Sequence, residues 1–89
     1  MKISKSTVRG LLYSAIKKTA EKLDIEMIEL KTSDELLADI KHKDEETYGL
    51  LKDFIKTFKL ANKKDTEKKK ANLESARIAL MSKLDKLSN

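Results

Sequence analysis

The chain has 89 residues, of which 39% are charged and 39% apolar, and its formal net charge at pH 7 is +5. A chain of this length forms one domain (1–89), and the lack of cysteine excludes disulfides and thiolate metal sites. Proline is absent and glycine occurs twice, in a background of Lys, Glu, Leu and Ala that is typical of long helices. We therefore expect an all-α fold. No apolar run is long enough to span a membrane and no signal peptide is visible, so we expect a cytoplasmic protein without a membrane partner.

The positive charge is concentrated in the second half of the chain. Residues 1–46 contain nine bases and ten acids, whereas residues 47–89 contain eleven bases and five acids, so the two halves carry −1 and +6. Such asymmetry indicates contact with nucleic acid or with an acidic protein surface. The alternative is a plain solvated surface, since eighteen of the twenty bases are lysine.

The first expected helix covers about residues 6–23, where apolar residues recur at steps of three and four. Ser4 or Ser6 can cap it by accepting a hydrogen bond from a free N–H of the first turn. The next segment, "DIEMIELK" (24–31), allows two interpretations. It could extend this helix, or it could form an apolar connection lying over the core.

The second expected helix begins at a capping box, because Thr32 is followed three residues later by Glu35. An apolar stripe then continues at helical spacing, interrupted once by Asp44, through Leu37, Ile40, Asp44, Tyr48, Leu51, Ile55 and Phe58. The stripe keeps its phase past Gly49. We therefore predict one long helix over 34–60, about 40 Å in length. The alternative is a turn at Gly49 that separates two helices.

The last expected helix covers about 66–87, with Asp65 or Thr66 as its cap. Its apolar seam consists of Leu73, Ala76, Leu80, Leu84 and Leu87, with Ile78 and Met81 at the edges. The three helices together predict a small bundle, packed up-down-up around a long central helix.

The sequence offers little for catalysis or metal binding. His42 is the only histidine, with Asp39 and Glu46 on the same face of the expected helix, but a carboxylate-bridged metal needs further ligands from other helices. There is no cysteine nucleophile, phosphate-binding loop or dinucleotide fingerprint. We therefore predict that the protein is not an enzyme and has neither a metal nor another cofactor. Asp44 on the apolar stripe is either a buried functional acid or a residue where the helix extends past its neighbours.

A lysine cluster lies between the second and third expected helices. The segment "ANKKDTEKKKAN" (61–72) contains five lysines and two acids. Such a patch attracts phosphates without reading sequence, whereas base readout favours Arg, Asn or Gln in a groove. Tyr48, Phe54 and Phe58 are expected in the core, which argues against stacking on single-stranded bases. The predicted nucleic-acid-binding residues are Lys59, Lys63, Lys64, Lys68, Lys69, Lys70 and Arg77.

Several segments, taken in order, resemble the N-terminal helical half of the GatB/YqeY family, the tail module of tRNA-dependent amidotransferases. "STVRGLLYSAIK" is similar to the opening helix of that family, with Arg9 at its arginine, and "TSDELLADI" and "LLKDF" resemble its second helix. "ANKKD" followed by "EKKKANLE" resembles its basic linker and next helix. The resemblance implies a helical module that contacts tRNA, with Lys63 and Lys64 at the basic linker.

A shorter likeness points to DNA. "DELLADIKHKDEETYG" is similar to a segment of the small double-stranded-DNA-binding proteins of T-even-like phages. That likeness would require the turn at Gly49.

Two functions are therefore expected from the sequence. The first is a small nucleic-acid-binding or accessory protein that contacts the phosphate backbone of DNA or structured RNA through its lysine-rich face. The second is a helical protein-interaction module, a phage or host adaptor or inhibitor, which could also form a homodimer through the helix at 66–87.

Overall fold

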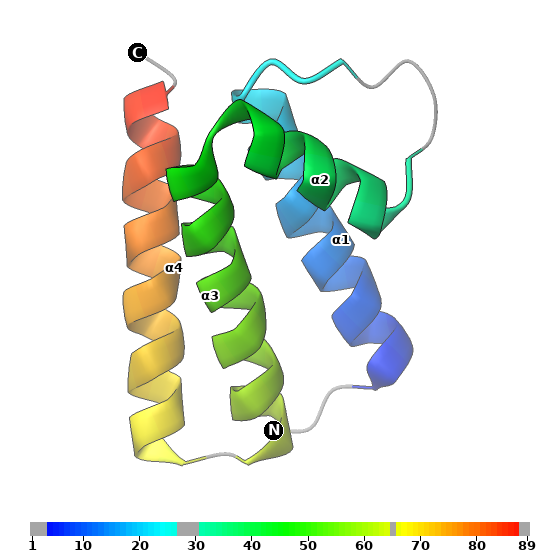
Figure 1. The fold of residues 1–89 in the computed structure, drawn as a ribbon. Coiled ribbons are helices and arrows are strands. Elements are labelled where there is room, and N and C mark those ends of the chain that lie inside the picture. Colours follow the sequence, from blue (N-terminus) through cyan, green and yellow to red (C-terminus); the bar gives the residue numbers. More distant parts are fainter. Residues whose placement is uncertain (1–3, 27–30, 65, 88–89) are drawn as a thin grey trace.

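The structure, a computed structural model, describes residues 4–26, 31–64 and 66–87. These residues form four helices and no strand: α1 (Lys5–Lys22), α2 (Ser33–Lys43), α3 (Glu45–Lys63) and α4 (Glu67–Leu87). Figure 1 shows α3 and α4 side by side and antiparallel, with α1 on the other side of α3 and the short α2 crossing α1. The all-α prediction is confirmed. The predicted three-helix bundle is wrong, because the described residues form four helices.

The predicted continuous helix over 34–60 is broken at Asp44, which adopts extended backbone angles (φ −158°, ψ 102°). The Asp44 N–H donates to the Ile40 carbonyl at 2.9 Å and closes α2, while the Asp44 carbonyl accepts from the Tyr48 N–H at 3.0 Å and opens α3. The Asp44 carboxylate accepts from the Glu46 N–H at 3.1 Å, a first-turn donor that has no partner within the helix. The apolar stripe keeps its phase across this break because α2 and α3 turn it toward the same core.

Gly49 lies inside α3, so the alternative break at Gly49 is wrong as well. Its φ is not positive, and a methyl group at this position would meet nothing within 4 Å. The outer two helices agree with the predicted ranges 6–23 and 66–87 to within one residue at each end.

The start and the end of α1 both have a local cause. The Ser4 hydroxyl caps the start by accepting from the Thr7 N–H at 3.3 Å, which confirms one of the two predicted caps. The helix ends where Asp24 takes a positive φ of 58°, a left-handed conformation that Asp tolerates better than most residues. The half-buried Ile25 then packs against the core, whereas the apolar residues predicted at 27, 28 and 30 lie outside the described residues.

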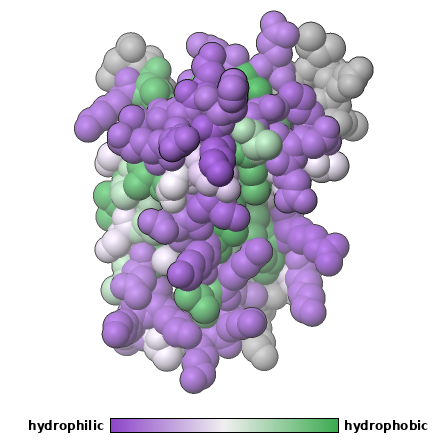
Figure 2. All heavy atoms as spheres, in the orientation of Figure 1, coloured by the Kyte–Doolittle hydropathy of each residue, from purple (hydrophilic) through white to green (hydrophobic). Residues whose placement is uncertain are grey.

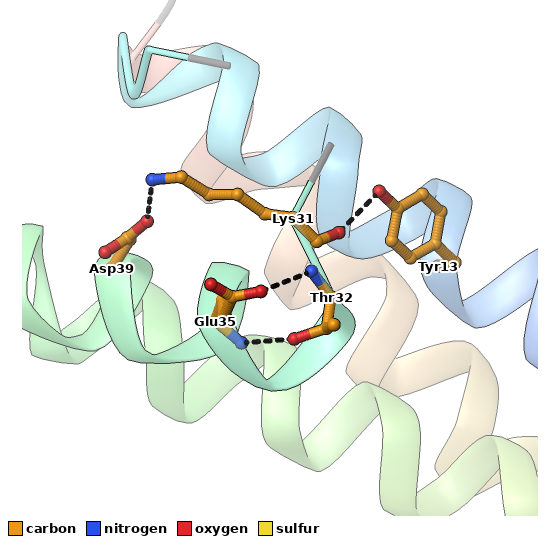
Figure 3. A network of polar contacts seen from close by, with 5 residues as sticks. All are labelled: Tyr13, Lys31, Thr32, Glu35 and Asp39. Atoms are coloured by element: carbon orange, nitrogen blue, oxygen red, sulfur yellow. Dashed lines mark hydrogen bonds and ion pairs between the residues drawn. The ribbon is translucent and has the colours of Figure 1, made fainter. Parts of the chain in front are cut away.

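A polar network holds the start of α2 against α1 (Figure 3). The predicted capping box is confirmed: the Glu35 N–H donates to Thr32 Oγ1 at 3.2 Å, and the Thr32 N–H donates to Glu35 Oε1 at 3.0 Å. The Tyr13 hydroxyl on α1 donates to the Lys31 carbonyl at 2.9 Å. Lys31 Nζ also pairs with Asp39 Oδ2 at 2.6 Å. Lys31, which precedes α2, is thus held both by Tyr13 on α1 and by Asp39 within α2.

The core is shared by all four helices, and its best-covered members, Ala20, Leu36, Ile40 and Leu51, have no exposed surface. Leu80 and Leu84 bury the seam of α4 against this cluster. Phe54 and Phe58 are half-buried and tilted against each other, with ring centroids 6.1 Å apart. None of the described helices combines the length and the apolar character needed to cross a membrane.

Candidate nucleic-acid interface

The turn between α3 and α4 brings the predicted lysines to one end of the molecule. Lys64 closes α3 by donating its N–H to the Leu60 carbonyl at 3.0 Å. Thr66 opens α4, because its hydroxyl accepts from the Lys69 N–H at 3.2 Å, as the sequence predicted for one of two cap residues. The short link leaves the last turn of α3 beside the first turn of α4, at the lower end of the molecule in Figure 1.

We call this surface the basic end; it comprises Lys59, Lys63, Lys64, Lys68, Lys69 and Lys70. All of these except the half-buried Lys69 are exposed. Within the described part of the chain, Lys63, Lys64 and Lys68 form no ion pair. Cations in the first turn of α4 oppose the helix dipole, so their presence there is not explained by helix stability.

Arg77, the remaining predicted residue, lies two turns beyond Lys70 on the same face of α4 by helical spacing. Its guanidinium forms a bidentate contact with the Glu74 carboxylate, in which Nε donates to Oε2 at 3.1 Å and Nη2 donates to Oε1. Hydrogen bonding to Glu74 raises the pKa of Arg77, and the same contact lowers the pKa of Glu74. Arg77 is therefore outside the basic end and already carries an anionic partner.

Sequence reasoning missed three cations, Lys5 and Arg9 on α1 and Lys52 on α3. They line, together with Lys59 and Lys63, a groove of about 880 Å³ between α1, α3 and the start of α2. The resemblance had drawn attention to Arg9, but the pairing of α1 with α3 could not be read from the chain. The one local signal was the spacing of Lys52, Lys59 and Lys63, which places all three on one face of α3.

The possible metal ligands do not lie on a single helix as expected. His42 is in the last turn of α2 and Glu46 in the first turn of α3, so the break at Asp44 separates them. Within residues 4–26, 31–64 and 66–87, no three side chains of the metal-binding types are grouped.

Asp44 has a structural explanation. Its carboxylate is half-buried, caps α3, accepts from the Thr47 hydroxyl at 2.9 Å and lies 3.7 Å from Lys83 Nζ on α4. The hydrogen bond from Thr47 is the main cause that lowers the pKa of Asp44. Neither of the two sequence interpretations, a functional buried acid or a residue past the end of its neighbours, describes this role.

Comparisons with protein-family models, curated proteins and solved structures found no match to this chain. The resemblances to the GatB/YqeY family and to the phage DNA-binding proteins therefore stay predictions that rest on local motifs.

Proposed function

We propose that the protein is a small non-enzymatic nucleic-acid-binding protein that contacts the phosphate backbone through the basic end. The observation that carries the proposal is the turn between α3 and α4, which brings Lys63 and Lys64 beside the first turn of α4 with its three lysines. Exposed lysines gathered in this way neutralise phosphates and release counterions, which gives affinity that falls steeply with salt.

Backbone contact fits the side chains better than base readout does. The basic end contains lysine and no arginine, and Arg77 is engaged with Glu74. Lysine is a point charge that suits phosphate, whereas reading a guanine edge favours the planar fork of arginine. The half-buried Phe54 and Phe58 pack against the core and are not free to stack on bases. We therefore expect little sequence specificity, on duplex DNA or on structured RNA.

The test is fluorescence anisotropy with a labelled DNA duplex and a labelled RNA hairpin, each titrated at about 50 mM and 150 mM salt. The key variant is Lys64→Glu/Lys68→Glu, which reverses two exposed charges of the basic end. Glutamate at 68 agrees with the dipole of α4, and glutamate at 64, the exposed C-cap of α3, opposes the dipole of α3 by only about 0.3–1 kcal/mol, so this variant should keep its fold. The expected result is binding that weakens with a steep log–log salt dependence and falls at least tenfold in the variant.

The matched control is Lys17→Glu/Lys18→Glu, because these two exposed lysines on α1 give the same change in net charge away from the basic end. The control should lose much less affinity than Lys64→Glu/Lys68→Glu. Equal losses would show that only net charge matters and would overturn a defined interface. No binding of either probe at 50 mM salt would overturn the proposal itself.

The second sequence hypothesis is a helical protein-interaction module, and one form of it, self-association through the last helix, has less support. The apolar seam of α4 packs largely against the other helices of the same chain, since Leu80 and Leu84 are buried in the core. Among the described residues of α4, Ile78 and Met81 are the large apolar side chains that stay exposed. Two side chains offer a small area for a stable dimer.

A further inference from the structure

The α1–α3 groove has an apolar floor, formed by the edge of the core together with more exposed apolar residues. Along α1 the floor is built by every fourth residue, and α2 and α3 complete it; its apolar residues include Val8, Leu12, Ile16, Leu37, Ile55 and Leu60. Val8, Leu12, Ile16 and Ile55 belong to the core and keep only 3–9% of their surface exposed, whereas Leu60 keeps 40%. Figure 2 shows an apolar band between hydrophilic walls on the face of the molecule where α3 and α1 adjoin. The groove follows three turns of α1, a length of about 16 Å.

The rim of the groove is almost entirely cationic. Lys5 and Arg9 line it from α1, and Lys52, Lys59 and Lys63 line it from α3. Asp34 is the one carboxylate among the described lining residues, so the five cations and one anion of this part of the chain sum to +4. Among the described residues, none of these five cations forms an ion pair.

Other cations of this chain do have acidic partners. Lys83 lies 3.2 Å from Glu46 and 3.7 Å from Asp44, and Lys31 pairs with Asp39. The chain has fifteen acids, yet among the described residues Asp34 is the one that lines the groove. Because unpaired charges of one sign repel each other along both walls, an anionic occupant is favoured over a neutral one.

We propose that the α1–α3 groove binds an amphipathic helix of a partner protein, with acidic residues on both flanks of its apolar face. Leucine-like side chains spaced at i, i+4 and i+7 would lie on the floor beside Leu60, and carboxylates on either side would meet Arg9 on α1 and Lys52 on α3. This is the helix-in-groove mode of recognition, in which apolar anchors give affinity and rim charges give orientation and specificity. The inference goes beyond the proposed nucleic-acid contact and does not depend on it.

Two other occupants fit less well. A phosphate backbone would satisfy the rim but has no apolar surface to cover the floor. A fatty acid would cover the floor but carries a single carboxylate, which cannot pair with cations on both walls. An amphipathic helix with two acidic flanks matches both the floor and the two rows of cations.

The experiment uses the intact chain and a fluorescein-labelled synthetic helix of about 14 residues, with leucines at i, i+4, i+7 and i+11 and glutamates on both flanks. Binding is measured by anisotropy at 150 mM salt, and amide shifts of the ¹⁵N-labelled protein locate the site. The expected result is saturable binding with the largest shifts around Leu12, Ile55 and Leu60. A peptide of the same composition in scrambled order, and one with lysine in place of glutamate, should bind at least tenfold more weakly.

Two variants test the rim and the floor separately. Arg9→Glu/Lys52→Glu should weaken peptide binding at least tenfold, and Leu60→Ala about threefold or more, while circular dichroism stays unchanged because all three side chains are exposed. Lys64→Glu/Lys68→Glu, which lies outside the groove, should bind the peptide within about threefold of the unchanged protein. The last variant also separates the two proposals, since it is the one expected to lose nucleic acid.

Three results would overturn the groove proposal. The first is equal binding of the acidic and scrambled peptides. The second is loss of duplex DNA binding in Arg9→Glu/Lys52→Glu as large as that in Lys64→Glu/Lys68→Glu, which would assign the groove to nucleic acid. The third is saturable binding of oleate in the groove without binding of the acidic peptide, which would assign it to a lipid.

Discussion

Lys83 on α4 reaches across to Asp44, the residue between α2 and α3, with Nζ 3.7 Å from Oδ2. The same ammonium lies 3.2 Å from Glu46 Oε1. One lysine thus ties the break between two helices to a third helix. Because Asp44 also caps α3, one carboxylate both starts α3 and pairs with α4.

Asp44→Ala should therefore destabilise the fold. The substitution removes the cap on the Glu46 N–H, the acceptor of the Thr47 hydroxyl and the partner of Lys83. Loss of an N-cap alone costs about 0.5–2 kcal/mol, and a domain of this size has a total stability of about 5–15 kcal/mol. Urea unfolding should show a lower midpoint with an unchanged slope.

The control for this substitution is Asp53→Ala, at an exposed position of α3 whose carboxylate makes no hydrogen bond within the described residues. Its effect should stay within about 0.5 kcal/mol. Asp44→Asn should recover part of the loss, because an amide can cap the helix but cannot pair with Lys83. Equal midpoints for Asp44→Ala and Asp53→Ala would contradict the role of the carboxylate.

The contribution of Asp44 should also depend on pH. The hydrogen bond from Thr47 lowers the pKa of Asp44 below its ordinary value of 3.8, so the folded state binds the proton less tightly than the unfolded chain. The stability that the charge contributes is fully present above pH 3.8 and is lost as pH falls through the lower folded pKa. The difference in unfolding free energy between the unchanged protein and Asp44→Asn should therefore shrink from pH 7 to pH 3. A constant difference would speak against this linkage.

Tyr13→Phe should loosen the junction between α1 and α2. The Tyr13 hydroxyl donates to the Lys31 carbonyl at 2.9 Å, one residue before the capping box. Its removal should cost about 0.5–1.5 kcal/mol of unfolding free energy. Tyr48→Phe is the matched control, since the Tyr48 hydroxyl forms no hydrogen bond within the described residues and its ring contact with Lys41 would be kept. Similar effects of both variants in urea unfolding would refute the importance of this bond.

Gly49→Ala should stabilise the protein. Gly49 is an exposed residue inside α3, its φ is negative, and a methyl group there would meet no other atom within 4 Å. Alanine is favoured over glycine in a helix interior by about 0.8–1 kcal/mol, which corresponds to a rise in Tm of roughly 4–8 °C. Thermal unfolding followed by circular dichroism measures the change. A fall in Tm would indicate a turn at Gly49.

Glu74→Gln should strengthen polyanion binding if the proposed function holds. Glu74 holds Arg77, so the substitution both removes an acid and releases a guanidinium on the same face of α4 as Lys70. The expected gain for duplex DNA at 50 mM salt is about twofold to fivefold, with a steeper dependence on salt. Asp85→Asn changes the net charge equally at an exposed site farther along α4 and should gain less. Equal gains would show that Arg77 takes no part.

The helix ends were predictable because their causes are local. Ser4, Thr32 and Thr66 each cap a helix through a hydrogen bond to an N–H three residues ahead, and such spacings can be read directly from a sequence. The break at Asp44 had a local signal too, since an Asp followed by Glu45 and Glu46 is a typical helix start. The continuous apolar stripe outweighed that signal, although two helices that share one core produce the same periodicity as one long helix.

The two candidate surfaces also differ in whether a local sequence pattern can predict them. The basic end follows from lysines that are close in sequence, so a single turn was enough to bring them together. The α1–α3 groove combines Arg9 with Lys52, which are far apart in the chain. Only the packing of α1 beside α3 makes them neighbours, and no local pattern contains that information.

The connection between α2 and α3 is a single residue, and this shortness has a consequence for assembly. If residue 44 became helical, α2 and α3 would join into one rod and carry α1 away from α3 and α4. The apolar faces thus uncovered, with Leu36 and Ile40 on one side and Leu51 on the other, would find their complement in a second copy of the chain. Short hinges of this kind favour exchange of halves between protomers. The carboxylate of Asp44 caps α3 and so favours the break over one continuous helix.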